Sequence, residues 1–177
     1  MKSLQIECGI CSGIAKRESH AWNYVKLGKN YYWIDVTWDD PIAHGKSSSK
    51  DDWLYHHYFL IDDELLFRTR KLDGNQPFVP SCRSLKDNYF VRNGLCFKEY
   101  RFETVNRLLS AHQKEGRTEM MFSTPKELKK ALKDLFDQKH FWDADIFKTK
   151  NGRKGGSFSY SFNEDLGILR ISFTVNP

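Results

Sequence analysis

The sequence lacks the features that mark several large classes of protein. It contains no apolar run long enough to span a membrane and no signal-peptide pattern. The formal net charge of +5 is small for 177 residues, and lysines and arginines are interleaved with acids along the chain. Neither a basic stripe nor a nucleic-acid-binding motif is present. We therefore expect no membrane span and no nucleic-acid partner, and the compartment is left open.

Cysteine is also scarce. The chain has four cysteines, Cys8, Cys11, Cys82 and Cys96. Cys8 and Cys11 have the C-x-x-C spacing of many zinc and redox sites, but no second pair follows and nothing indicates a strand-to-helix redox turn. We expect neither a metal nor a cofactor. Cys82 and Cys96 could form a disulfide in an oxidising compartment, and the sequence does not decide whether they do.

The rest of the composition is that of a folded chain rich in strands. Hydrophobic residues make up 40% of the sequence and aromatic residues 15%, which is enough for a core and suits short strands. The pattern predicts strands over residues 4–8, 20–27 and 31–38, with a turn at residues 12–13. The Gly-Lys pair at residues 28–29 predicts a two-residue hairpin turn between the last two of these strands.

Helical patterns begin in the second half of the chain. Apolar residues at helical spacing predict a helix over residues 102–112. Thr124, followed by Pro125 and Glu127, predicts the capped start of a second helix. The strands expected around these helices lie at residues 89–98, 119–122, 158–162 and 169–173. The order strand, helix, strand, helix, strand, strand predicts two helices packed on one face of a four-stranded sheet.

A stretch with Gly74, Pro77 and Pro80 predicts a connection between two parts of the chain. We predict an α+β fold with a first domain of mainly antiparallel strands over residues 1–87. A second, small α+β domain is expected over residues 88–177, and its residues do not indicate a role.

The predicted hairpin brings a histidine and an aspartate to one face of the sheet. With the turn at residues 28–29, residue i faces residue 57 − i, so Trp22 faces Asp35. His20 accordingly faces Thr37. His20 and Asp35 are then diagonal neighbours, roughly 7–8 Å apart, a gap that their side chains can close. A carboxylate so placed fixes one imidazole nitrogen and leaves the other to act as a base. A surface or structural pair remains the alternative, and a one-residue slip in register would separate the two side chains.

Two segments of this hairpin resemble a known family. Residues 20–23, His-Ala-Trp-Asn, and residues 33–41, Trp-Ile-Asp-Val-Thr-Trp-Asp-Asp-Pro, are similar to the signature of bacterial transglutaminase-like proteins. That superfamily is related to peptide N-glycanases and to cysteine proteases of papain-like fold. A looser similarity continues through residues 58–64, 80–82 and 89–97. The resemblance covers about half the chain.

The resemblance implies roles for residues of the hairpin. By it, His20 is the general base and Asp35 is the carboxylate that orients it. The supporting positions around this pair are Trp22, Asn23, Thr37 and Trp38, with Asp39 and Asp40 structural at the following turn. The implied activity is that of a cysteine hydrolase or acyltransferase, which acts on protein or peptide amides through a thioester. Relatives are often secreted or attached to the cell surface, so cell-wall material is a further candidate substrate.

The nucleophile has two interpretations. Residues 9–15, Gly-Ile-Cys-Ser-Gly-Ile-Ala, mimic the family's Gly-Val-Cys-x-Gly-Tyr-Ala motif and make Cys11 a candidate. Cys11 lies only nine positions before His20, which leaves no room for the helix and strand that separate them in the family. The alternative is that residues 4–11 form the strand before the histidine strand. The nucleophile helix is then missing and the catalytic core is incomplete, and this is the interpretation that we favour.

An incomplete core has two consequences. Its first strands would expose an apolar face, through which we predict a homodimer. The chain would be either part of an enzyme or a non-catalytic binding or scaffolding protein built on a degenerate transglutaminase-like domain.

Overall fold

The protein consists of two compact units, Met1–Asn93 and Gly94–Pro177. The computed structural model describes residues 5–39, 54–149, 152–153 and 155–176. The predicted α+β class is confirmed, because both units combine mainly antiparallel sheets with helices. The division between the units falls six residues beyond the predicted boundary at residues 87–88, after a short helix.

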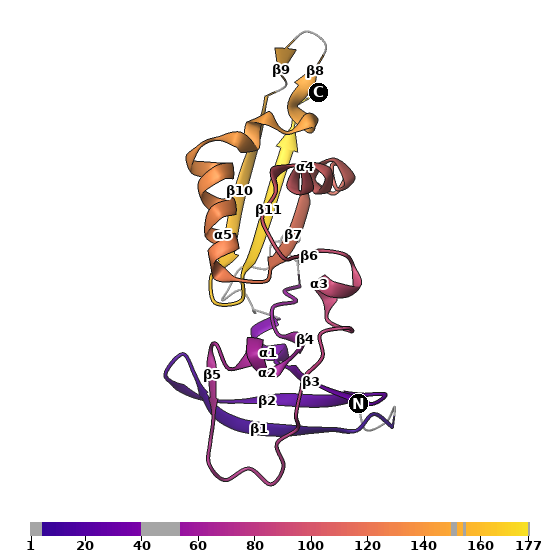
Figure 1. Ribbon diagram of the computed structural model, residues 1–177, viewed down its shortest axis with the longest axis vertical. Coiled ribbons are helices and arrows are strands. Elements are labelled where there is room, and N and C mark those ends of the chain that lie inside the picture. Colours follow the sequence, from indigo (N-terminus) through magenta and orange to yellow (C-terminus); the bar gives the residue numbers. More distant parts are fainter. Residues whose placement is uncertain (1–4, 40–53, 150–151, 154, 177) are drawn as a thin grey trace, which may run out of the picture. The chain divides into compact units, whose positions relative to one another are not determined.

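The first unit is a five-stranded antiparallel sheet in the order β4-β3-β2-β1-β5. Its strands are β1 (Cys8–Ala15), β2 (Glu18–Leu27), β3 (Asn30–Ile34), β4 (Phe59–Ile61) and β5 (Arg70–Leu72). Three short helices accompany the sheet, namely α1 (Val36–Asp39), α2 (Asp63–Leu66) and α3 (Tyr89–Arg92). The strands β1 and β2 are the longest of this unit and run side by side (Figure 1).

The β2–β3 hairpin has the predicted register. Leu27 pairs with Asn30 across Gly28, which has a φ of +59°, and Asn23 pairs with Ile34. The predicted strand over residues 31–38 is too long, however, because α1 begins at Val36. Beyond Asp35 the chain leaves the sheet, because the Asp35 carbonyl oxygen accepts hydrogen bonds from the amides of Trp38 and Asp39, both at 3.2 Å.

The predicted turn at residues 12–13 is wrong, since both residues lie inside β1. The chain instead turns at Lys16 and Arg17, which both have positive φ angles. Gly13 is not a turn residue but lies at a crowded position within β1. A Cβ on this residue would lie 2.1 Å from the Lys71 carbonyl oxygen and 2.8 Å from the Trp22 ring. The glycine therefore marks a close approach of β5 to β1.

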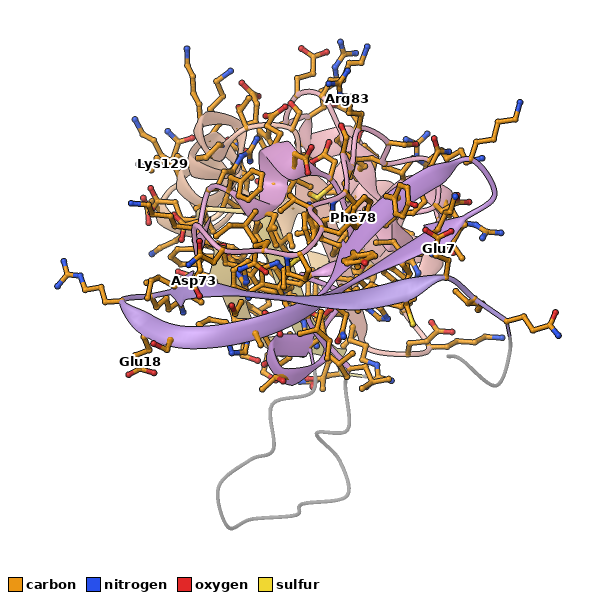
Figure 2. The ribbon with its side chains drawn as sticks, turned by 90° about the horizontal axis from the view of Figure 1, so that it is seen from below. Glu7, Glu18, Asp73, Phe78, Arg83 and Lys129 are labelled. Carbon is orange, nitrogen blue, oxygen red and sulfur yellow. The ribbon has the colours of Figure 1, made fainter. Side chains whose placement is uncertain are left out.

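The two faces of this sheet are covered differently. Cys11, Trp22 and His20 share one face by the β1–β2 register, which we call the His20 face. Figure 2 shows the segment that carries Asp73 and Phe78 running along β1 and β2. On the opposite face of the sheet, Ile10 of β1 is 65% exposed. The homodimer itself stays a prediction.

The second unit has two helices on a four-stranded sheet, as predicted. The sheet order is β10-β11-β7-β6, with β6 (Cys96–Phe97), β7 (Arg117–Phe122), β10 (Gly156–Asn163) and β11 (Ile168–Val175). Helices α4 (Phe102–Ala111) and α5 (Pro125–Leu132) bury Val105, Leu109 and Leu128 in one core with Met120 and Ile171 of the sheet (Figure 1). The remaining elements are a π-helical turn at Lys133–Asp137, 3-10 turns at His140–Asp143 and Asp145–Phe147, and a small ladder of β8 (Lys148–Thr149) with β9 (Gly152–Arg153).

Local capping explains one success and one failure of the sequence patterns. The Thr124 side chain accepts a hydrogen bond from the Glu127 amide at 3.4 Å, which is the predicted cap of α5. The strand predicted over residues 89–98 is wrong over its first half, which forms α3. Asn88 caps that helix by accepting a hydrogen bond from the Phe90 amide at 3.1 Å. A capping asparagine thus overrides the strand preference of the aromatic residues that follow it.

Candidate functional site

The predicted contact between His20 and Asp35 is confirmed. His20 Nε2 lies 2.9 Å from Asp35 Oδ2, with side-chain exposures of 18% and 1% respectively. His20 lies on β2 beyond the last β2–β3 pair, and Asp35 follows the end of β3. The imidazole therefore keeps some access to solvent, whereas its carboxylate partner is buried.

A buried arginine holds the same carboxylate. Arg70, the first residue of β5, donates to Asp35 Oδ2 from Nε at 3.1 Å and from Nη2 at 2.5 Å. Its side chain is 1% exposed. Arg70 was not among the predicted site residues, because its position depends on the pairing of β5 with β1, in which Arg70 lies opposite Ala15. No motif or periodic pattern marks this position.

Aromatic rings surround the side chains of His20, Asp35 and Arg70. The guanidinium carbon of Arg70 lies 3.6 Å from the centre of the Tyr58 ring and 5.0 Å from that of Trp38. The His20 ring lies 6.1 Å from Trp22 and 6.0 Å from Trp38. These distances allow cation–π attraction to the arginine and make the site largely apolar around its charges.

Of the four supporting residues that the resemblance implies, only two lie beside His20. Trp22 and Trp38 lie beside the His20 ring. The Asn23 side chain instead donates to the Gly9 carbonyl at 3.3 Å, and Thr37 is exposed on α1. The structure therefore brings the two tryptophans to the site but not Asn23 or Thr37. Asp40 and Pro41 lie outside the described residues.

A second buried carboxyl group lies near Asp35. The Tyr58 amide donates to both carboxylate oxygens of Asp39, at 2.9 and 3.1 Å. Burial raises the pKa of Asp39 to about 7, and the charge of Asp35 adds to this effect, whereas hydrogen bonds from the Tyr58 and His57 amides oppose it. Asp39 therefore gains or loses a proton near neutral pH.

Cys11 has the environment of a core residue. It lies in the middle of β1 opposite Trp22 and is 1% exposed. Its Sγ donates to the Phe78 carbonyl oxygen at 3.6 Å, and burial raises the pKa of the thiol. Nucleophilic cysteines have lowered pKa values and lie at helix starts or beside cations. Cys11 shares the sheet face of His20, but its described state is that of an inert thiol.

The other cysteines do not take the place of Cys11. Cys8 lies three residues before Cys11 on the same strand, so the two side chains point to opposite faces of the sheet. Burial raises the pKa of both Cys82 and Cys96. All four cysteines are free thiols.

Two further properties concern the described part of the chain alone. Within it, no group of three or more histidine, cysteine or acidic side chains is arranged to hold a metal ion. No helix within residues 5–39, 54–149, 152–153 and 155–176 is long and apolar enough to cross a membrane.

Thiol reactivity gives a direct test of the state of Cys11. We expect iodoacetamide to label Cys11 more slowly than an unhindered thiol at every pH from 6 to 9, because the side chain is buried and its pKa is raised. His20→Ala should leave that rate unchanged. The measurement is mass-spectrometric labelling, mapped cysteine by cysteine, with half-buried Cys8 as the internal comparison. Fast labelling of Cys11 below pH 7 that disappears in His20→Ala would instead identify Cys11 as a thiolate paired with His20.

Neither a protein-family model nor a curated protein sequence matches this chain. The interpretation of the site therefore rests on its own geometry and on the resemblance of residues 20–41.

Proposed function

We propose that the first unit carries the histidine and aspartate half of a transglutaminase-like cysteine acyl-transfer site. The substrate would be a protein or peptide amide, and the intermediate a thioester. The observation that carries this proposal is the 2.9 Å contact between His20 Nε2 and Asp35 Oδ2, in which the imidazole is partly exposed and the carboxylate buried.

The contact suits His20 for general-base work. An ionised carboxylate only accepts hydrogen bonds, so the proton of a neutral His20 ring lies on Nε2, facing Asp35. Nδ1 then carries the free lone pair. In the first step this nitrogen would take the proton of a thiol that attacks the amide carbon and later give it to the leaving amine. In the second step it would take a proton from the water or amine that attacks the thioester and return it to the departing thiolate as the C–S bond breaks.

The proposal assigns the nucleophile to a cysteine other than the four of this chain. Cys11 is buried, its thiol donates to a carbonyl and its pKa is raised, all of which work against a thiolate. A thiol supplied by a longer polypeptide or by a partner would meet His20 from its exposed side. Cell-wall peptides are among the amides that such a site could take.

A second candidate function is supported by the same state of Cys11. A domain in which burial raises the pKa of Cys11, Cys82 and Cys96 would suit a non-catalytic binding or scaffolding protein for peptides or cell-wall material. The two candidates differ in whether His20 accelerates a reaction.

The second half-reaction tests His20 without needing the missing thiol. The substrate is a glutamyl peptide supplied as its N-acetylcysteamine thioester. Water attacks the carbonyl carbon, the C–S bond breaks, and the thiol leaves with a proton. We expect the protein to accelerate this hydrolysis, and His20→Ala to slow it about tenfold or more, since general-base catalysis contributes about 10²–10⁴-fold in complete sites. The rate is followed with a thiol reagent that reports free N-acetylcysteamine.

The chain offers a matched control. His140 also contacts a carboxylate, with Nδ1 2.7 Å from Asp134 Oδ1, but its side chain is 50% exposed. His140→Ala should leave the rate at the wild-type value. Equal rates for the wild type and His20→Ala would contradict the catalytic proposal and favour the binding function.

A further inference from the structure

We propose that Arg70 is the positioning residue of His20, which fixes the Asp35 carboxylate and, through it, the tautomer and orientation of the imidazole. The expected effect of Arg70 on the reaction rate rests on the proposed function, whereas its expected effect on the His20 tautomer does not. Three hydrogen-bonding nitrogens meet at one atom, Asp35 Oδ2, namely Arg70 Nε, Arg70 Nη2 and His20 Nε2. Oδ1 of Asp35 is buried and receives no hydrogen bond from the described residues. Both Arg70 and His20 therefore bind the Asp35 carboxylate through its Oδ2 atom.

Charge balance gives Arg70 its first effect on His20. The side chains of Asp35 and Arg70 are both 1% exposed, so the anion needs a nearby cation. Arg70 supplies that charge permanently. His20 can therefore remain neutral beside Asp35 and keep Nδ1 as a proton acceptor. Without Arg70, His20 would be the cation in contact with Asp35, and an imidazolium has no lone pair to offer.

Other charged groups near His20 and Asp35 come from α1 and from the β1–β2 turn. Asp39 of α1 lies close enough to Asp35 for their charges to interact. Lys16, in the β1–β2 turn, has its ammonium group 4.5 Å from the centre of the Trp38 ring. Neither is hydrogen-bonded to His20 in the described residues, whereas Arg70 shares an oxygen atom with it. Arg70 therefore has the shortest path to the imidazole.

The surroundings of Arg70 require a planar guanidinium. Its third nitrogen, Nη1, donates to Thr69 Oγ1 at 2.8 Å, so every guanidinium nitrogen has an acceptor. The Tyr58 ring lies against the guanidinium at 3.6 Å and restricts its rotation. A lysine ammonium would provide the charge but not two converging N–H groups held in a plane. We therefore expect Lys to be a poor replacement for Arg70.

The test combines a tautomer measurement with a rate. Nitrogen-15 chemical shifts of the His20 ring should show one tautomer in the wild type, with the proton on Nε2. In Arg70→Ala and Arg70→Lys we expect mixed tautomers or imidazolium at pH 7. His20-dependent thioester hydrolysis should fall about tenfold in both variants, the size expected when the general base is misplaced.

Chemical rescue separates positioning from a general loss of structure. Millimolar guanidinium ion should occupy the space against Tyr58 in Arg70→Ala and restore both the single tautomer and the rate, whereas methylammonium should restore neither. Arg68→Ala is the matched control, since Arg68 pairs with the exposed Glu64 at 2.7 Å, and it should behave as the wild type. Arg70→Lys keeps the charge and provides a folded comparison if Arg70→Ala does not fold.

The outcomes distinguish this inference from the proposed function. A wild-type tautomer in both Arg70 variants would overturn the positioning role. A tautomer that depends on Arg70, together with equal rates for the wild type and His20→Ala, would uphold the positioning role and overturn the proposed catalysis.

Discussion

Replacing Asp35 with alanine should lower the free energy of unfolding of the first unit by about 3–5 kcal/mol, the usual cost of breaking a buried ion pair from one side. The variant leaves the Arg70 guanidinium at 1% side-chain exposure without its anion. It also removes the partner of His20. Tryptophan fluorescence in a urea titration measures the effect, because Trp142 is the one tryptophan of the sequence outside residues 1–93.

A double variant shows where this energy comes from. In Asp35→Ala combined with Arg70→Met, neither charge remains, so the buried guanidinium is no longer uncompensated. We expect the double variant to be at least as stable as Asp35→Ala alone, which means that the two substitutions are strongly non-additive. Additive losses would show that the carboxylate and the guanidinium stabilise the fold independently.

An exposed ion pair sets the scale for comparison. Glu64 is 77% exposed and pairs with Arg68 across one helical turn. Glu64→Ala should cost less than about 1 kcal/mol, as is usual for surface pairs. A loss of similar size for Asp35→Ala would mean that the Asp35–Arg70 pair is solvated in solution and that Arg70 does not position His20.

Much of the site geometry follows from short-range information. The Gly-Lys turn at residues 28–29 fixes the register of the β2–β3 hairpin, and the register places His20 beside Asp35. Both residues belong to one hairpin, so no long-range pairing had to be known. The second unit was predicted well for the same reason. Its helices and strands carry local signals, such as the Thr124 cap.

The parts that were missed depend on contacts between distant segments. Arg70 lies 35 positions from Asp35 and reaches it through the pairing of β5 with β1. The Val-Thr-Trp sequence at residues 36–38 favours a strand by propensity, but the Asp35 carbonyl oxygen accepts hydrogen bonds from the Trp38 and Asp39 amides and starts a helical turn. The amide of the distant Tyr58 donates to the Asp39 carboxylate at the end of that turn. A buried arginine also contradicts the usual expectation that charged residues are exposed, so nothing in a single sequence marks it.

The pKa of Asp39 predicts an unusual dependence of stability on pH. Burial raises this pKa from 3.8 to about 7 in the folded protein, whereas the unfolded chain keeps the lower value. Between these two pH values the folded state binds more protons than the unfolded state, so the contribution of Asp39 to stability falls as pH rises from about 4 to about 7. Above pH 7 the contribution is constant. The full change is at most about 4 kcal/mol, from about 1.4 kcal/mol for each pKa unit.

Asp39→Asn removes this dependence, because asparagine does not ionise while its Oδ1 can still accept the Tyr58 amide. We expect the variant to gain about 2–3 kcal/mol on the wild type between pH 5 and pH 8, measured as the difference in unfolding free energy at the two pH values. Glu7→Gln is the control. Its hydrogen bond from Tyr31 lowers the pKa of Glu7, so the carboxylate stays ionised in both states across this range and the difference from the wild type should stay constant. An equally constant difference for Asp39→Asn would show that the Asp39 carboxylate is stabilised by its amide donors more than burial destabilises it. The ionised form would then be the one present beside Asp35 at neutral pH.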